Sequence, residues 1–194
     1  NRTTVALKHL GYTVISFTPE ITADIQILPL GHLNTYENLL LNATPIPTLL
    51  YQLKTPLKGF QYESHRRRIL NCFDLLPDIA KMRNPTFAFV HIMCPHAPFV
   101  FGRNGEAIDP PWPFSLDEGV HFFANFHSSS ADYYVKAYAD KTAFITRKTQ
   151  EAIEKILSNP ASSNAVIIVQ SDHGPGIDTG QWDPSSERQM RERF

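Results

Sequence analysis

The sequence is poor in cysteine, in long apolar runs and in charge of one sign, and each shortage excludes a class of protein. Among 194 residues there are two cysteines, Cys72 and Cys94, with no CxxC pair and no zinc-finger spacing, so no disulfide framework is expected. The formal net charge of −1 gives no basic surface for nucleic acid. No segment approaches the roughly 18 consecutive apolar residues of a membrane span, and the first residues lack the regions of a signal peptide.

What the sequence does contain is an alternation of helical and strand patterns. With 42% apolar residues the chain can form a core that buries roughly 70% of its unfolded surface. Residues 3–10 have helical spacing that ends at Gly11, and "YTVISF" (12–17) reads as a strand. A short helix is expected around "PTLLYQL" (47–53). Residues 64–82 predict a helix in which Pro77 introduces a kink or begins a second helix, and "TFAFVHIM" (86–93) predicts a second buried strand.

The second half of the chain continues this alternation. Residues 102–130, rich in Pro, Gly, Phe and Ser, form a connection of the length usual for functional lids or disordered segments. A long helix follows, with an apolar stripe of Val135, Tyr138, Ala139, Ile145, Ala152, Ile153 and Ile156. It ends near Pro160, and "AVIIVQ" (165–170) predicts a buried strand. The expected fold class is α/β, a mostly parallel sheet covered by helices on both faces, in one domain without an internal linker.

Two groups of polar residues follow the two strongest predicted strands. Asp172 and His173 come directly after residues 165–170, and "HIMCPHAPF" places His91 and His96 at the end of the other strand. Prolines on both sides of His96 restrict the backbone and so the orientation of its imidazole. A DHG tripeptide or a single histidine at a strand end is weak by itself. Because ligands of parallel sheets collect at the carboxyl ends of strands, the pair together predicts a site where Asp172 and His96 face a common cleft.

These residues carry a resemblance to a known family. "VIIVQSDHGPG", the preceding helix "YADKTAFITRKTQEAIEKILS" and "FAFVHIMCPHAPFVFGRNG" resemble the sulfatase-like members of the alkaline phosphatase superfamily. The similarity is to membrane-anchored bacterial proteins related to lipoteichoic acid synthases and phosphoethanolamine transferases. It extends to "LKHLGYTVISF" and "YENLLLNATPIPTLL", and therefore covers most of the chain.

The resemblance implies a metal-dependent hydrolase or transferase that acts on sulfate or phosphate esters. Asp172 and His173 match the family's paired metal ligands, and His96 matches the histidine that contacts the ester oxygens of the substrate. His91 matches a position that is often histidine in these relatives and is a second substrate-binding candidate without an assigned role. A carboxylate with a neutral imidazole favours zinc or manganese, because calcium and magnesium prefer shells of oxygen ligands.

The sequence also departs from the family pattern. Relatives carry their first metal-binding Asp and their Thr, Ser or modified Cys nucleophile ahead of the segment that matches "LKHLGY", and nothing precedes that segment here. Cys94 does not fit a formylglycine precursor, which needs C-x-P-x-R, and is interpreted as a small packing residue. The chain is therefore expected to be the C-terminal portion of a catalytic domain, inactive by itself, from an extracytoplasmic parent anchored in the membrane by an upstream segment.

Two hypotheses from different classes remain open. In the first, the chain is part of a sulfatase-like enzyme and contributes half of a bimetal site. In the second, it is a non-catalytic binding or structural module that keeps the fold and a vestigial metal site. These residues do not distinguish sulfate from phosphate esters, since both are tetrahedral oxyanions.

Overall fold

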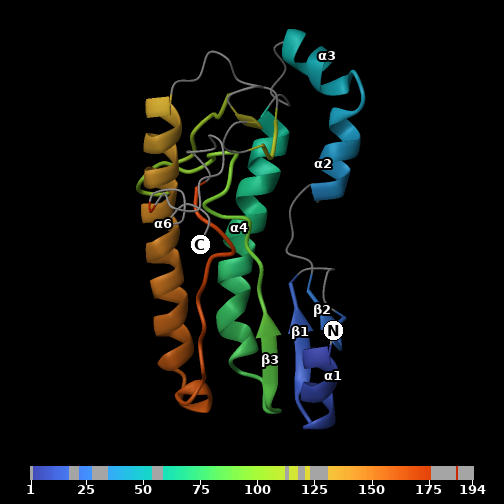
Figure 1. The fold of residues 1–194 in the computed structure, drawn as a ribbon, viewed down its shortest axis with the longest axis vertical. Helices are drawn as coiled ribbons and strands as arrows, with labels where there is room; N and C mark the ends of the chain where they lie inside the picture. Colours follow the sequence, from blue (N-terminus) through green and yellow to red (C-terminus); the bar gives the residue numbers. More distant parts are fainter. Residues whose placement is uncertain are drawn as a thin grey trace. The chain divides into compact units, whose positions relative to one another are not determined.

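The computed structural model describes residues 2–17, 22–27, 35–53, 59–111, 114–117, 121–122, 131–175 and 187, and Figure 1 labels its helices and strands. The protein is of the mixed α/β class and divides into two compact units, each built from segments far apart in sequence. Unit 1 comprises Asn1–Gly31, Arg66–Met93 and Arg147–Ile167, and unit 2 comprises His32–His65, Cys94–Thr146 and Ile168–Phe194. The single-domain organisation expected from the sequence stays a prediction.

Unit 1 begins with helix α1 (Arg2–His9) and its cap. Gly11 adopts a φ of 86°, and the amide of Tyr12 donates to the carbonyl of Leu7 at 3.0 Å, which closes the last turn. Glycine suits this position because a Cβ would be strained at positive φ. The predicted helix end at Gly11 is confirmed, and strand β1 (Thr13–Ser16) follows as expected.

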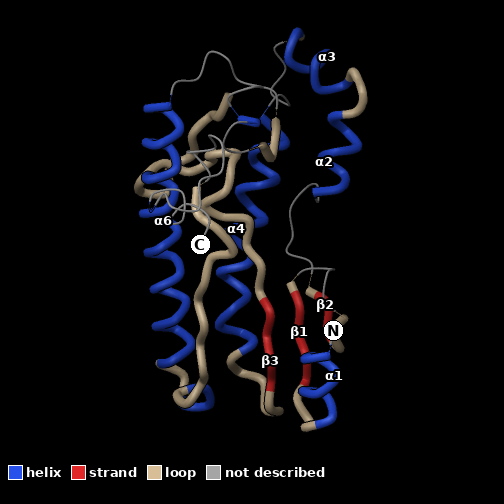
Figure 2. Tube along the Cα trace, viewed as in Figure 1, coloured by secondary structure: helices blue, strands red, loops and turns tan. Residues whose placement is uncertain are grey.

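A three-stranded parallel sheet forms the centre of unit 1, in the order β2-β1-β3 (Figure 2). Strand β2 is Ile25–Gln26 and strand β3 is Thr86–Phe89, within the segment predicted as the second strand. Asp24, directly before β2, connects this strand to β1 and α1. Its carboxylate accepts hydrogen bonds from the amide of Val14 at 2.9 Å and from Nζ of Lys8 at 2.6 Å.

Two helices pack on β1. Side chains alternate between the two faces of a strand, so Ile15 and Phe17 lie on one face, where they pack against Cys72 of helix α4 (Phe60–Ile79). Val14 points to the other face and is also fully buried. Helix α1 contacts β1, in agreement with a strand that is covered on both faces. Helix α4 starts four residues before the predicted Ser64 and continues through Pro77 as one helix.

Unit 2 contains helices α2 (Thr35–Asn42) and α3 (Ile46–Gln52), the first residues of α4 and the first part of helix α6 (Ala131–Leu157). Helix α3 confirms the short helix expected near residues 47–53. The core of unit 2 is aromatic, consisting of Ala97, Phe99, Phe122, Tyr134 and Ala137. Around it pack Ile108, Tyr133 and Tyr138.

The stretch 102–130, expected as a lid or a disordered segment, contributes buried residues to unit 2 among those that the structure describes. Phe101 and Ala107 form an antiparallel bridge around a turn, and Phe114 and Phe122 are buried. The hydroxyl of Tyr62 donates to the carbonyl oxygen of Pro111 at 2.8 Å. The side-chain amide of Asn42 donates to the backbone carbonyl oxygen of Phe114 at 2.9 Å. Large aromatic side chains thus attach this stretch to the core.

The buried strand predicted for residues 165–170 is wrong. The segment after the short helix η2 (Pro160–Ser162) is irregular and pairs with no strand in the described residues (Figure 2). Val166, Ile168 and Val169 are 89%, 80% and 65% exposed. β-branched residues favour a strand only where a neighbouring strand supplies hydrogen bonds and packing, and none of the strands in the described residues pairs with this segment.

Candidate functional site

His96 lies in a loop of unit 2 whose neighbours are built into the core. Ala97 and Phe99 are buried at 1% and 0% exposure, whereas His96 is half-buried. The Cys94–Pro95 and Ala97–Pro98 peptide bonds on the two sides of His96 are both cis. Nδ1 of His96 lies 2.7 Å from the carbonyl oxygen of Ala97. The neutral imidazole that fits this contact carries its proton on Nδ1, which leaves Nε2 as the acceptor.

Lys141 of α6 holds this loop from inside the core. It is fully buried, and its Nζ donates to the carbonyl oxygen of His96 at 2.6 Å and to that of Pro98 at 3.0 Å. The Cys94 side chain is a third neighbour of the amine. Burial lowers the pKa of Lys141, and the nearby Cys94 opposes this. Burial likewise raises the pKa of the Cys94 thiol, opposed by Lys141, so Cys94 has no activated thiolate character.

Asp172 and His173 lie in an exposed turn of unit 2, with side chains 76% and 42% exposed. The amide of His173 donates to Oδ1 of Asp172 at 3.1 Å, and the hydroxyl of Ser171 donates to the carbonyl of His173. Nδ1 of His173 lies 2.7 Å from the carbonyl oxygen of Gly174. As at His96, a proton on Nδ1 leaves the lone pair on Nε2, which lies 3.7 Å from Oδ2 of Asp172.

Tyr134 of α6 joins the two motifs. Its hydroxyl donates to the carbonyl oxygen of Pro175 at 3.0 Å, two residues after His173. Its ring meets that of Phe99 edge to face at 5.0 Å, three residues after His96. The motifs therefore meet on one helix rather than at the edge of one sheet. The sheet-edge prediction fails because the segment before Asp172 is not a strand and β3 ends at Phe89.

The donors of Asp172 and His173 fit zinc or manganese in type, and their spacing also fits. Two ligands of a tetrahedral zinc ion lie roughly 3.4 Å apart, close to the 3.7 Å between Nε2 and Oδ2. Asp172 and His173 supply two ligands, whereas most catalytic zinc sites have three protein ligands. In the part of the chain that the structure describes, no three His, Cys, Asp or Glu side chains gather in a position to hold a metal ion.

The remaining sequence candidate, His91, is exposed and belongs to unit 1, two residues after β3. Sequence reasoning missed two residues that organise the site, Tyr134 and Lys141. A signal was present, because Lys141 lies three residues after Tyr138 and four before Ile145, inside the apolar stripe. Two members assigned to that stripe, Val135 and Ala139, are exposed, and Tyr134 and Ala137 are buried instead.

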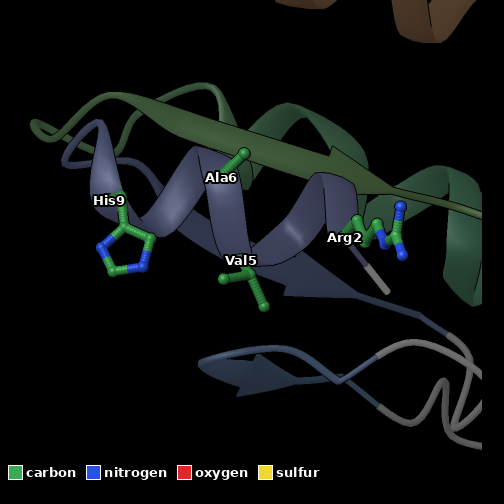
Figure 3. A pocket seen from close by; sticks show the side chains of 4 residues that line it. All are labelled: Arg2, Val5, Ala6 and His9. Atoms are coloured by element: carbon green, nitrogen blue, oxygen red, sulfur yellow. The ribbon is translucent and has the colours of Figure 1, made fainter.

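A shallow hollow lies elsewhere, on the exposed side of α1 in unit 1 (Figure 3). Arg2, Val5, Ala6 and His9 line it. All four come from successive turns of a single helix, and the set lacks the convergent polar groups of a ligand site. The hollow is therefore not treated as a candidate ligand site.

Comparison with known proteins gives no match to a family model, to a curated protein or to a solved structure. Of the helices in the described segments, none combines the length and apolar character needed to cross a membrane.

Proposed function

We propose that the protein is part of a metal-dependent, sulfatase-like hydrolase or transferase that acts on sulfate or phosphate esters. The fold would be of the alkaline phosphatase type, and the parent protein extracytoplasmic and membrane-anchored. The single observation that carries the proposal is the attachment of both motifs to Tyr134. Its hydroxyl holds Pro175, and its ring packs on Phe99, so the turn of Asp172 and the loop of His96 share one support.

In this proposal Asp172 and His173 hold a divalent metal, zinc or manganese. Such an ion polarises a phosphoryl or sulfuryl oxygen. The protein's own contribution is to present Oδ2 of Asp172 and Nε2 of His173 side by side, with the histidine tautomer set by Gly174. Nδ1 of His96 is engaged by Ala97, so Nε2 is the nitrogen that faces the ester oxygens, and it donates to them when the imidazole carries its second proton. If protonated, His96 stabilises the charge that develops on the transferred group. The nucleophile belongs to a segment outside these 194 residues.

A second candidate function has an observation in its favour. The described residues bring two metal donors together and no third, which suits a vestigial site on a non-catalytic binding module. In both cases the chain contributes Asp172 and His173 to metal binding. The two candidates differ in whether turnover of an ester accompanies the metal.

The test is metal titration of the protein with zinc and manganese, followed by calorimetry, for the unmodified chain and for Asp172→Ala and His173→Ala. Each substitution should weaken binding at least tenfold and leave the far-ultraviolet circular dichroism unchanged. Asp132→Ala and His9→Ala are matched controls, because they remove an exposed carboxylate and an exposed imidazole outside the motif. If Asp172→Ala or His173→Ala binds as tightly as the unmodified chain, the assigned ligand is wrong.

Turnover of aryl phosphate and aryl sulfate esters by the full-length parent then decides between the two candidates. Metal binding that requires Asp172 and His173, with ester turnover lost in His96→Ala, supports the enzyme. The same metal binding without turnover of either ester supports the non-catalytic module.

A further inference from the structure

The amine of Lys141 is enclosed by the loop that carries His96. A lysine at 0% exposure is unusual, because its charged form loses hydration unless hydrogen bonds replace it. An ammonium group has three N–H donors. The carbonyl oxygens of His96 and Pro98 take two of them, and the Cys94 side chain is the third neighbour. The number of polar neighbours around the amine of Lys141 thus equals the number of its N–H donors.

The two carbonyl groups held by Lys141 lie on either side of Ala97. The carbonyl of Ala97 in turn is the group that Nδ1 of His96 approaches at 2.7 Å. Fixing the backbone before and after Ala97 fixes the direction of its carbonyl, and this direction sets the plane and the tautomer of the imidazole. We infer that Lys141 is a positioning residue for His96, whose Nδ1–H it keeps directed at Ala97, so that Nε2 is the nitrogen that takes up a second proton and donates it to the substrate oxygens. The role of Nε2 toward a substrate depends on the proposed function, whereas the effect of Lys141 on the His96 tautomer does not.

His173 provides an internal comparison within unit 2. Its Nδ1 approaches the carbonyl of the following residue, Gly174, at the same distance of 2.7 Å. Lys141 donates to the carbonyls around Ala97, and neither of its two backbone bonds involves residues 172–175. Loss of Lys141 should therefore change the tautomer of His96 and leave that of His173 unchanged. A general loosening of unit 2 would change both.

The experiment measures the imidazole ¹⁵N shifts of the whole 194-residue protein at alkaline pH, which is raised until the shifts no longer change. The variants are Lys141→Met, which keeps the stem and removes every donor, and Lys136→Met. The second is the matched control, because Lys136 lies on the same helix with its side chain 77% exposed. We expect His96 to carry its proton on Nδ1 in the unmodified protein and in Lys136→Met. In Lys141→Met, at least half of the His96 side chains should carry their proton on Nε2 instead.

Lys141→Met removes the amine that donates to one part-buried and one buried carbonyl group, and can prevent folding. Lys141→Gln then takes its place, since the shorter amide can still donate to one carbonyl, and should give an intermediate tautomer shift. An unchanged His96 tautomer in whichever variant folds overturns the inference, as does an equal change at His173. Failure of both variants to fold also overturns it, because Lys141 would then support the whole unit and not the loop.

This readout involves neither metal nor turnover. A protein that fails to bind zinc or manganese through Asp172 and His173 refutes the proposed function, but the His96 tautomer can still depend on Lys141. A protein that binds metal and turns over esters with an unchanged tautomer in Lys141→Met keeps the proposed function and refutes the positioning role.

Discussion

The turn at Gly105, which follows the His96 loop, allows a quantitative prediction of the effect of a substitution on stability. Its φ is +88°, and a Cβ at this position would overlap the ring of Phe144 on α6. The left-handed conformation costs a residue with a side chain roughly 1–2 kcal/mol, and inserting a methyl group into a packed site costs roughly 1–3 kcal/mol. Gly105→Ala should therefore lower the free energy of unfolding by roughly 2–5 kcal/mol.

Two other glycines separate these contributions. Gly11 has a φ of +86° with open space around its Cα, so Gly11→Ala should show the conformational cost alone, roughly 1–2 kcal/mol. Gly59 also has open space, and no positive φ, so Gly59→Ala should change stability by less than about 1 kcal/mol in either direction. Urea unfolding followed by circular dichroism, at constant m-value, measures all three.

Removing the ring of Phe144 isolates the overlap. The ring of Phe144 packs at a tilt of 41° against that of the buried Phe101, with centroids 4.8 Å apart, so Phe144→Ala is itself destabilising. In that background Gly105→Ala should cost only about as much as Gly11→Ala, which corresponds to a coupling energy of roughly 1–3 kcal/mol in the double-mutant cycle. A Gly105→Ala variant no less stable than Gly11→Ala, or a coupling energy near zero, refutes the packing of this turn against α6.

Three further predictions concern the site and unit 1. Tyr134→Phe removes the donor to Pro175 and should cost about 0.5–1.5 kcal/mol, with faster proteolysis after residue 170, whereas the exposed Tyr36→Phe should change neither. Lys8 and then the amide of Val14 hold the pKa of Asp24 below its usual range. The carboxylate therefore stabilises the fold at neutral pH, and this contribution is lost as the pH falls through the lowered pKa; an unchanged acid unfolding curve in Asp24→Asn would contradict this. The 194-residue protein alone should give no ester turnover above a metal-only blank. If turnover is observed and is lost in His96→Ala, the nucleophile lies within these residues.

The sequence was most informative where local signals and tertiary structure agree. At Gly11 a positive-φ residue follows a helical pattern, and the cap forms as predicted because it depends on the backbone alone. Strands β1 and β3 combine apolar side chains with a parallel partner, so their propensity and their environment coincide. Residues 165–170 have the same propensity, but Val166 and Ile168 meet solvent, and propensity without a partner strand does not produce a strand.

Lys141 shows why the site itself was harder to predict. Apolar periodicity assigns residues to a buried face by their hydrophobicity, and lysine is the residue type that this rule places outside. The position is decided instead by the loop that packs against α6, whose carbonyls at His96 and Pro98 lie outside any strand or helix. Buried carbonyl groups need donors, and an amine on α6 supplies them at 2.6 and 3.0 Å. A lysine inside an apolar helical stripe is thus explained by carbonyl groups outside regular secondary structure on the loop that packs against it, and a proline-rich loop, with few amide groups of its own, is where such carbonyl groups are expected.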